Sequence, residues 1–194
     1  MKTRSWLRRF GAIVGTLSGL ALVFVVGMRF TDGPIFVFPG GTFKSGELVS
    51  HESFGWADVA QIREIEFQLE LTGRSRVTWF IVHEGTPYIP CGFCANTFLK
   101  RWPRQLEVDD RVVLRVDGRR IEGRAHRVEH ASTEYLAVTE TKRAKYSDTT
   151  SAYEQTENKA AGRLVGAIQF AEDLVAEPES DSERESWLYR IDPR

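Results

Sequence analysis

Hydrophobic and polar positions divide the chain into three parts. An apolar N-terminal segment comes first, segments of alternating apolar and polar residues follow, and the C-terminal part has helical patterns. Phe10 to Met28 contains no charged residue across nineteen positions. A helix of that length measures about 28 Å, close to the hydrocarbon thickness of a bilayer. The pattern predicts a transmembrane anchor over residues 1–30, in contact with lipid from Phe10 to Met28. We expect residues 31–194 to form one domain.

The charges that flank the apolar run indicate its orientation. Four basic residues precede it, whereas Arg29 alone follows it closely. This asymmetry favours a cytoplasmic N-terminus, with the main domain outside the cytoplasm. A cleaved signal peptide is the alternative, with Val25 and Gly27 as the small residues of its cleavage site. We favour a retained anchor, because the run is longer than a usual signal core and lacks an Ala-x-Ala site.

The middle of the chain alternates between apolar and polar residues, as strands with one buried face do. Residues 64–71 follow this period of two, and so do residues 111–116 and 120–126. The run from Arg76 to His83 is apolar on both faces, so we expect a central strand there.

Two dipeptides between the alternating runs predict tight hairpins. Glu84-Gly85 and Asp117-Gly118 are each typical of two-residue turns between antiparallel strands. Hairpins at this density, without crossover helices, predict a mainly β fold, an antiparallel barrel. Gly123 lies inside an alternating run and indicates a bend or a close approach of backbone.

Helical patterns flank and follow the strands. A short helix is expected over residues 95–108, broken at its proline. Ser132 is a suitable N-cap for a helix ending near residue 146. Apolar spacing predicts a second helix over residues 158–176. The segment from residue 187 to 194 is expected to add a last strand to the sheet.

Charge is balanced overall but unevenly distributed. The net charge is −1, yet residues 100–127 contain nine basic and five acidic side chains. These charges alternate with apolar residues along predicted strands. Together with a membrane anchor, this argues against nucleic-acid binding and favours contact with anionic lipid head groups.

The turn over residues 72–76 is the sharpest chemical signal. Gly73 permits an unusual backbone angle, and Arg74 and Arg76 flank the hydroxyl of Ser75. Thr78 follows two positions later. Guanidinium groups, hydroxyls and backbone N–H groups gathered in this way can bind one phosphate. The alternative is a solvated hairpin corner whose arginines only balance nearby glutamates.

A second cationic block contains Lys100, Arg101 and Trp102. An indole beside cations can stack on a flat ring or line a charged cleft. The alternative is a core tryptophan on a short helix with its basic neighbours outside.

Cys91 and Cys94 are the two cysteines of the chain. They could remain ordinary thiols or, outside the cytoplasm, close a small disulfide. They could instead bind zinc together with His126 and His130, if folding brings the four residues together.

Taken in order, these segments resemble the flavin-binding split-barrel superfamily, and within it the pyridoxamine-phosphate-oxidase-like and deazaflavin-dependent nitroreductase proteins. The resemblance covers residues 33 to 194. The segments that carry it are residues 71–78, 100–103, 110–118, 145–146 and 187–194. The family's glycine-rich stretch before its Trp-Pro block is replaced here by residues 90–96.

The resemblance implies a six-stranded split barrel, commonly a homodimer, with short covering helices. It implies that the phosphate of FMN or of a deazaflavin lies near the Thr-Gly-Arg turn. By position, the phosphate would contact Arg74, Ser75, Arg76 and Thr78. The ring or its tail would border Lys100, Arg101 and Trp102.

The hypothesis is therefore a membrane-anchored, cofactor-binding split barrel that acts as a two-electron oxidoreductase on an unassigned substrate. The cofactor would supply the hydride, so a catalytic side-chain motif is not required. Two alternatives stay open: a cofactor-free binding or interaction module at the membrane, and a zinc-stabilised domain.

Overall fold

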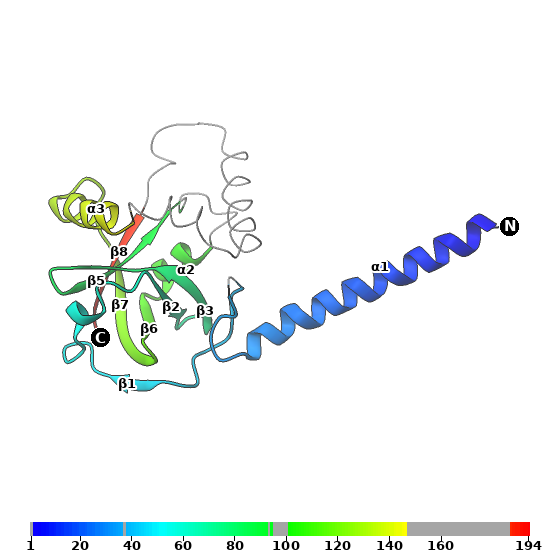
Figure 1. The fold of residues 1–194 in the computed structure, drawn as a ribbon, viewed down its shortest axis with the longest axis horizontal. Coiled ribbons are helices and arrows are strands. Elements are labelled where there is room, and N and C mark those ends of the chain that lie inside the picture. Colours follow the sequence, from blue (N-terminus) through cyan, green and yellow to red (C-terminus); the bar gives the residue numbers. More distant parts are fainter. Residues whose placement is uncertain (1, 37, 93, 95–100, 147–186) are drawn as a thin grey trace.

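The computed structural model describes residues 2–36, 38–92, 94, 101–146 and 187–194. The helix predicted over residues 158–176 lies outside them. Helix α1 (Lys2–Gly27) projects from the barrel as a single long rod (Figure 1). A one-turn 3-10 helix, η1 (Met28–Phe30), continues it. The stretch Phe10–Phe30 is long and apolar enough to cross a membrane, and none of its side chains from residue 10 to 27 is buried.

Within the described residues, eight strands form one sheet with the order β3-β2-β6-β7-β8-β5-β4. The strands are β1 (Glu47–Val49), β2 (Glu64–Leu69), β3 (Arg74–Trp79), β4 (Ile81–His83), β5 (Thr86–Cys91), β6 (Arg111–Val116), β7 (Arg119–Arg127) and β8 (Trp187–Pro193). Each strand runs antiparallel to its hydrogen-bonded neighbours along this path. Strand β1 lies outside the path and pairs in parallel with the first residues of β7.

The sheet curls into a split barrel, because its first and last strands are consecutive in the chain. β3 ends at Trp79 and β4 begins at Ile81, so Phe80 joins the two ends of the sheet. With β3 and β4 taken as halves of one bent strand, the barrel has the six strands that the resemblance implies, and β1 is an addition.

The prediction of one central strand from Arg76 to His83 is therefore wrong. Phe80 and Ile81 are both fully buried, but Phe80 belongs to the main core and Ile81 to a second cluster under α3. The run is apolar on both faces because it passes between two cores at the bend. It is not enclosed by hydrogen-bonded strands along both edges.

The alternation predicted for the remaining strands is confirmed. The main core is built from side chains on one face of β2, β6 and β7, each no more than 1% exposed: Phe67, Leu69, Val112, Leu114, Val116 and Ile121. A 3-10 turn, η2 (Trp56–Val59), and two short helices, α2 (Trp102–Val108) and α3 (Thr133–Tyr146), pack around the barrel.

The two helices differ in how well the sequence predicted them. Ser132 caps α3 as expected, since its Oγ accepts the N–H of Tyr135 at 3.1 Å. The helix α2 begins only at Trp102, and Pro103 lies in its first turn. The predicted break at this proline is wrong, because the first turn of a helix leaves its N–H groups unpaired and accommodates proline well.

Both predicted hairpin turns are confirmed. Glu84 and Gly85 have φ of 50° and 76°, and Asp117 and Gly118 have φ of 49° and 73°. Two successive left-handed residues make the turn that matches the twist of antiparallel strands. The close approach predicted at Gly123 is also present: a Cβ there would lie 2.6 Å from Cγ2 of Ile191.

The end of α3 holds the bend at Phe80. The Tyr146 hydroxyl lies 2.9 Å from the Phe80 carbonyl oxygen and accepts the Phe80 N–H at 3.1 Å. Nζ of Lys145 donates to the same carbonyl at 2.7 Å and to the Ile62 carbonyl at 2.5 Å. Burial lowers the pKa of Lys145 to about 8, and the charge of Arg63 adds to the shift. The Phe80 carbonyl is thus satisfied by side chains, whereas the Phe80 N–H also donates to the Arg63 carbonyl at 3.0 Å.

Candidate functional site

β3 carries the residues expected to contact a phosphate, and its alternation separates them. Arg74, Arg76 and Thr78 share one face of the strand, whereas Ser75 lies on the other. Opposite the first three on β2 are the buried residues Leu69, Phe67 and Ile65, in that order. Three of the four candidates therefore face the barrel interior at its split.

Ser75, on the other face of β3, stabilises the fold through hydrogen bonds within the protein. It is fully buried, and its Oγ donates to the Gly41 carbonyl at 2.6 Å. Its backbone exchanges two hydrogen bonds with Gly40, at 2.9 and 3.3 Å. These bonds cover the outer edge of β3, so the hydroxyl is engaged within the protein and does not join the other three residues.

Arg76 is the most unusual charged residue of the site. Its Nε is buried and has no hydrogen-bond partner in the described part of the chain. Burial, together with the positive charge of Arg74, lowers the pKa of Arg76 to about 10. Removing a guanidinium from water without a counter-charge is costly. The arrangement suits an anion that a ligand would supply.

The structure brings Trp102 to Arg76 across the barrel. Cζ of Arg76 lies 5.8 Å from the centre of the indole ring. The ring is itself buried and packs against Phe67 at 5.4 Å and Tyr189 at 5.1 Å between ring centres. Trp102 is therefore a core residue on a short helix, as the second interpretation of this block proposed, and its ring also lies beside the Arg76 guanidinium.

The other members of the second block are not brought to Arg76 by any described contact. Arg101 precedes α2 and is exposed, as is Arg104 on the helix. Lys100 lies outside the described residues. The sequence did not single out Tyr189 and Phe67 as neighbours of the site. Their positions on the apolar face of alternating runs were the available signal, but alternation does not reveal which strands are adjacent.

The arginines of the turn do not balance the nearby glutamates. Nη2 of Arg74 donates to the Pro39 carbonyl at 3.4 Å. Among the described residues, neither Arg74 nor Arg76 forms an ion pair, and Glu66 is paired with Arg115 instead. The interpretation of this turn as a charge-balanced corner is not supported.

Most of the arginines on β6 and β7 are neutralised within the protein. Arg111 pairs with Asp109 and Arg124 with Asp110, both at 2.6 Å. Arg115 reaches Asp32 at 2.9 Å. These pairs leave less free charge for lipid head groups than the sequence alone suggests.

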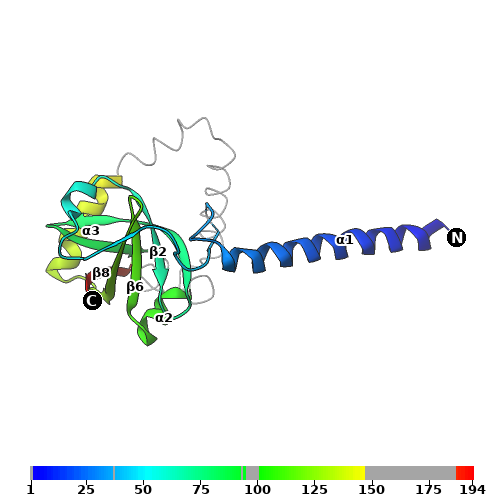
Figure 2. The same ribbon diagram turned by 90° about the horizontal axis from the view of Figure 1, so that it is seen from below.

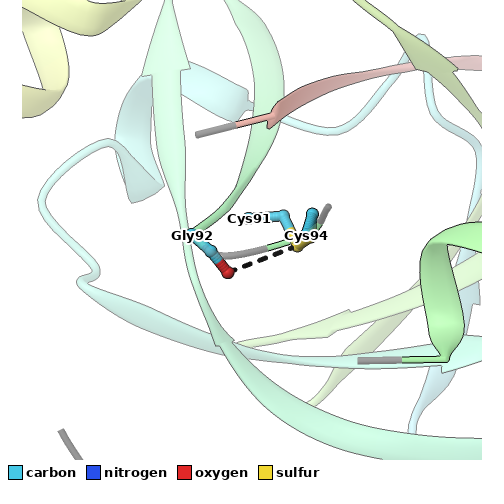
Figure 3. The surroundings of a disulfide bond; sticks show 3 residues. All are labelled: Cys91, Gly92 and Cys94. Atoms are coloured by element: carbon cyan, nitrogen blue, oxygen red, sulfur yellow. Dashed lines mark hydrogen bonds between the residues drawn. A yellow bond between two sulfur atoms is a disulfide. The ribbon is translucent and has the colours of Figure 1, made fainter. Parts of the chain in front are cut away.

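The two cysteines are joined in a disulfide at the end of β5 (Figure 3). Both are buried, at 3% and 1% exposure for Cys91 and Cys94. His126 is held elsewhere, with Nδ1 2.6 Å from Asp192 Oδ2 and Nε2 3.4 Å from Asp110 Oδ2. The described residues contain no group of three potential metal ligands. The disulfide interpretation is confirmed, and the contacts of His126 do not support the zinc hypothesis.

No protein-family model and no curated protein matches the sequence. Several solved structures are similar in fold, including the two that follow. The haem storage protein HutZ from Vibrio cholerae is 14% identical, with a TM-score of 0.40 over 71% of this chain and 87% of that chain. A putative pyridoxamine 5'-phosphate oxidase from Listeria innocua is 15% identical, with a TM-score of 0.35 over 71% of this chain and 88% of that chain.

The name of the second structure is that of the family that the sequence motifs resemble. The comparison supports a similar fold and nothing further. Likenesses as distant as these carry no functional information. The function of this chain is therefore inferred from its own residues.

The described residues fit the phosphate end of a flavin-type ligand. Arg76 offers a buried guanidinium nitrogen without a partner, Arg74 adds a second positive charge, and Thr78 adds a hydroxyl on the same strand face. The described residues do not show where a flavin ring would stack, because the indole of Trp102 is packed into the core.

Proposed function

We propose that this protein is a membrane-anchored split barrel that binds a phosphate-bearing cofactor of the flavin type, FMN or a deazaflavin. The observation that carries the proposal is the buried Nε of Arg76, which has no hydrogen-bond partner among the described residues. A phosphate would supply both the missing acceptor and the missing negative charge. Guanidinium groups bind phosphate oxygens through charge-assisted bonds, often two at a time.

Each residue of the strand would have a distinct part in binding. Arg76 would hold the phosphate, and Arg74 would add attraction from its place two residues earlier. Thr78 would donate a hydroxyl hydrogen bond from the same face. Ser75 would support the site indirectly, because its bond to Gly41 fixes the edge of β3.

The proposed chemistry is a two-electron reduction of a substrate that the sequence does not identify. A bound flavin or deazaflavin supplies the hydride in such reactions. The protein would bind the phosphate, orient the cofactor and exclude water from one side of it. The buried indole beside Arg76 supports the last of these tasks, because it shields the guanidinium from solvent.

Comparing FMN with riboflavin tests the phosphate contact, because the two ligands differ only in the phosphate group. Binding to the full chain in detergent micelles would be followed by quenching of flavin fluorescence. A charge-assisted contact contributes about 1.5–3 kcal/mol, so FMN should bind at least about tenfold more tightly than riboflavin. Arg76→Met should remove this preference, whereas Arg104→Met, which changes an exposed arginine on α2, should keep it. Equal binding of FMN and riboflavin by the wild-type protein would refute the proposal.

A second candidate function is a binding module without a cofactor. It is favoured by the packing of Trp102 between Phe67 and Tyr189, since this ring fills space inside the barrel. A protein that binds neither FMN nor a deazaflavin, but whose Arg76 still binds inorganic pyrophosphate, would support this alternative.

We also propose that α1 spans the bilayer as a retained anchor. The apolar stretch Phe10–Phe30, in which no side chain from residue 10 to 27 is buried, supports this, because a helix of this kind is stable in lipid and aggregates in water. Retention in membranes after alkaline carbonate extraction, with α1 still present by mass spectrometry, is the expected result. Release of a chain shortened near residue 27 would favour the signal peptide instead.

A further inference from the structure

A short aromatic loop lies between the anchor and the barrel. We define the interfacial loop as residues 30–36 and 38. Its side chains Phe30, Phe36 and Phe38 are 72%, 86% and 47% exposed. Ile35 and Phe38 exchange two backbone hydrogen bonds, at 3.2 and 3.0 Å, which close a tight turn around the tip. Exposed phenylalanines grouped on a small loop indicate a site that binds an apolar partner.

The interfacial loop folds back along the anchor rather than leading away from it. The ring of Phe38 meets the ring of Phe24 edge to face, with 5.6 Å between ring centres. Phe24 lies three residues before the end of α1 at Gly27, about 4.5 Å along the helix axis. Both ribbon views show the loop standing beside the end of α1 (Figures 1 and 2). The loop therefore reaches the depth of the last turn of the apolar helix.

The backbone of the loop is held in place by the barrel. Asp32 accepts the N–H of Lys44 at 2.7 Å and Nη1 of Arg115 at 2.9 Å. These hydrogen bonds, with that of Lys44 first, hold the pKa of Asp32 far below its usual range. Nζ of Lys44 donates to the Phe30 carbonyl at 2.7 Å. The aromatic tips are thus mounted on a fixed platform and not on a loose linker.

Phe36 occupies a strained position at the tip. Its φ of 52° lies in the left-handed region, which disfavours a side chain as bulky as phenylalanine. Strain of this kind persists where the surrounding structure imposes it, often at sites of interaction. Here the turn directs the most exposed ring of the loop away from the barrel.

We propose that the interfacial loop inserts into the boundary between head groups and acyl chains of the leaflet next to the barrel, with Phe36 as the deepest contact. The inference rests on the membrane anchoring of α1 proposed above. A lipid surface is the partner that fits, because the loop is continuous with a helix suited to lipid and touches it through Phe24 and Phe38. Phenylalanine is among the apolar residues that interfacial segments bury at this boundary. The loop and helix would together fix the orientation of the barrel on the membrane, which a helix alone cannot do.

The orientation has a consequence for the site on β3. Gly40 pairs with Ser75, and the Pro39 carbonyl accepts a bond from Arg74. Both tie the strand that carries Arg76 to the residues that follow the loop. Inserting the loop would place the phosphate site close to the membrane surface.

Single cysteines carrying an environment-sensitive NBD fluorophore test the proposal in the full chain, reconstituted in phosphatidylcholine vesicles with phosphatidylglycerol. The native cysteines are both in the disulfide, so the added thiol reacts alone. The test variant is Phe36→Cys. The matched control is Leu136→Cys, another exposed apolar residue, on α3. Both views place α3 on the side of the barrel away from α1 (Figures 1 and 2). A third variant, Leu20→Cys, reports on the anchor itself.

The expected result is strong quenching of the label at position 36 by lipids with a shallow nitroxide, together with protection from aqueous iodide. Insertion of about 5–10 Å is typical of interfacial segments and would give this pattern. The label at position 136 should be quenched by iodide alone, and the label at position 20 by deep nitroxide lipids.

Three outcomes would overturn the proposal, and they are distinguishable. Iodide quenching at position 36 equal to that at position 136, with position 20 still protected by lipid, would reject the loop and leave the anchor intact. Iodide access at both 36 and 20 would reject the anchor as well. Protection from iodide at position 36 without quenching by nitroxide lipid would mean that protein, such as a second copy of the chain, covers the loop.

Discussion

Replacing Arg76 with methionine should make the ligand-free protein more stable, because Nε of its half-buried guanidinium is buried and has no hydrogen-bond partner among the described residues. The pKa of Arg76 is lowered from its usual value to about 10, first by burial and then by the charge of Arg74. One pKa unit corresponds to about 1.36 kcal/mol, so keeping the charge in the folded state costs about 3 kcal/mol. At pH 7 the folded and unfolded states are both charged, because this pH lies below both pKa values. The full cost therefore applies.

Methionine replaces the aliphatic part of arginine without its charge. The variant loses the contact between the guanidinium and Trp102, which offsets part of the gain. Buried charges replaced by apolar side chains of similar volume are often neutral or stabilising. We expect Arg76→Met to raise the free energy of unfolding by about 1–3 kcal/mol.

Urea unfolding of the full chain in micelles, followed by tryptophan fluorescence, measures this change. Trp102 lies beside the substitution and reports on it directly. Arg104→Met is the control and should shift stability by no more than about 0.5 kcal/mol, because Arg104 is exposed. Adding FMN should stabilise the wild-type protein by mass action, and it should stabilise Arg76→Met less, by no more than riboflavin does.

A loss of stability in Arg76→Met would refute the reasoning. It would mean that the guanidinium makes favourable interactions in the ligand-free protein, so that no ligand is needed to satisfy it. The proposed phosphate site would then lose its main support.

Three further changes test the fold and the connection between α1 and the barrel. Gly123→Ala should destabilise the barrel by about 1–3 kcal/mol in urea unfolding, because the new Cβ would lie 2.6 Å from Cγ2 of Ile191; an unchanged midpoint would contradict this. Tyr146→Phe should cost about 1–3 kcal/mol by the same assay, because it removes the hydroxyl bonded to the backbone of Phe80; full stability in the variant would show that Lys145 and the Arg63 carbonyl hold the bend without the hydroxyl. Asp32→Asn should be less stable than wild type at pH 7. The difference should narrow below about pH 4, since the pKa of Asp32 is lower in the folded than in the unfolded state and its contribution is lost on protonation; a pH-independent difference would count against this account.

The sequence predicted the strands wherever one face is buried and the other is not. The alternation over β2 and β6 placed the correct residues in the core, and Ser132 marked the start of α3. The prediction from alternation failed at Phe80. A bend that passes between two cores produces the same run of apolar residues as a central strand. Local pattern reports burial on each face but not which core a residue enters.

The candidate site was predicted in part for a similar reason. The sequence identified Arg76 and Trp102, which the fold brings within 5.8 Å. It grouped Ser75 with them by proximity in the chain, although a strand sends consecutive side chains to opposite faces. The contact of Phe24 with Phe38 had no local signal, since it depends on the chain reversing after the anchor.

The position of β8 in the sheet has a consequence for how the barrel is made. This strand follows all the other described strands in the sequence, yet it pairs with β7 on one side and β5 on the other. Until the ribosome has synthesised it, two inner strands present unpaired backbone edges, which invite association with other chains. Closure of the barrel is therefore a late event in biogenesis, and a nascent chain that crosses the membrane would need a chaperone to shield those edges until then.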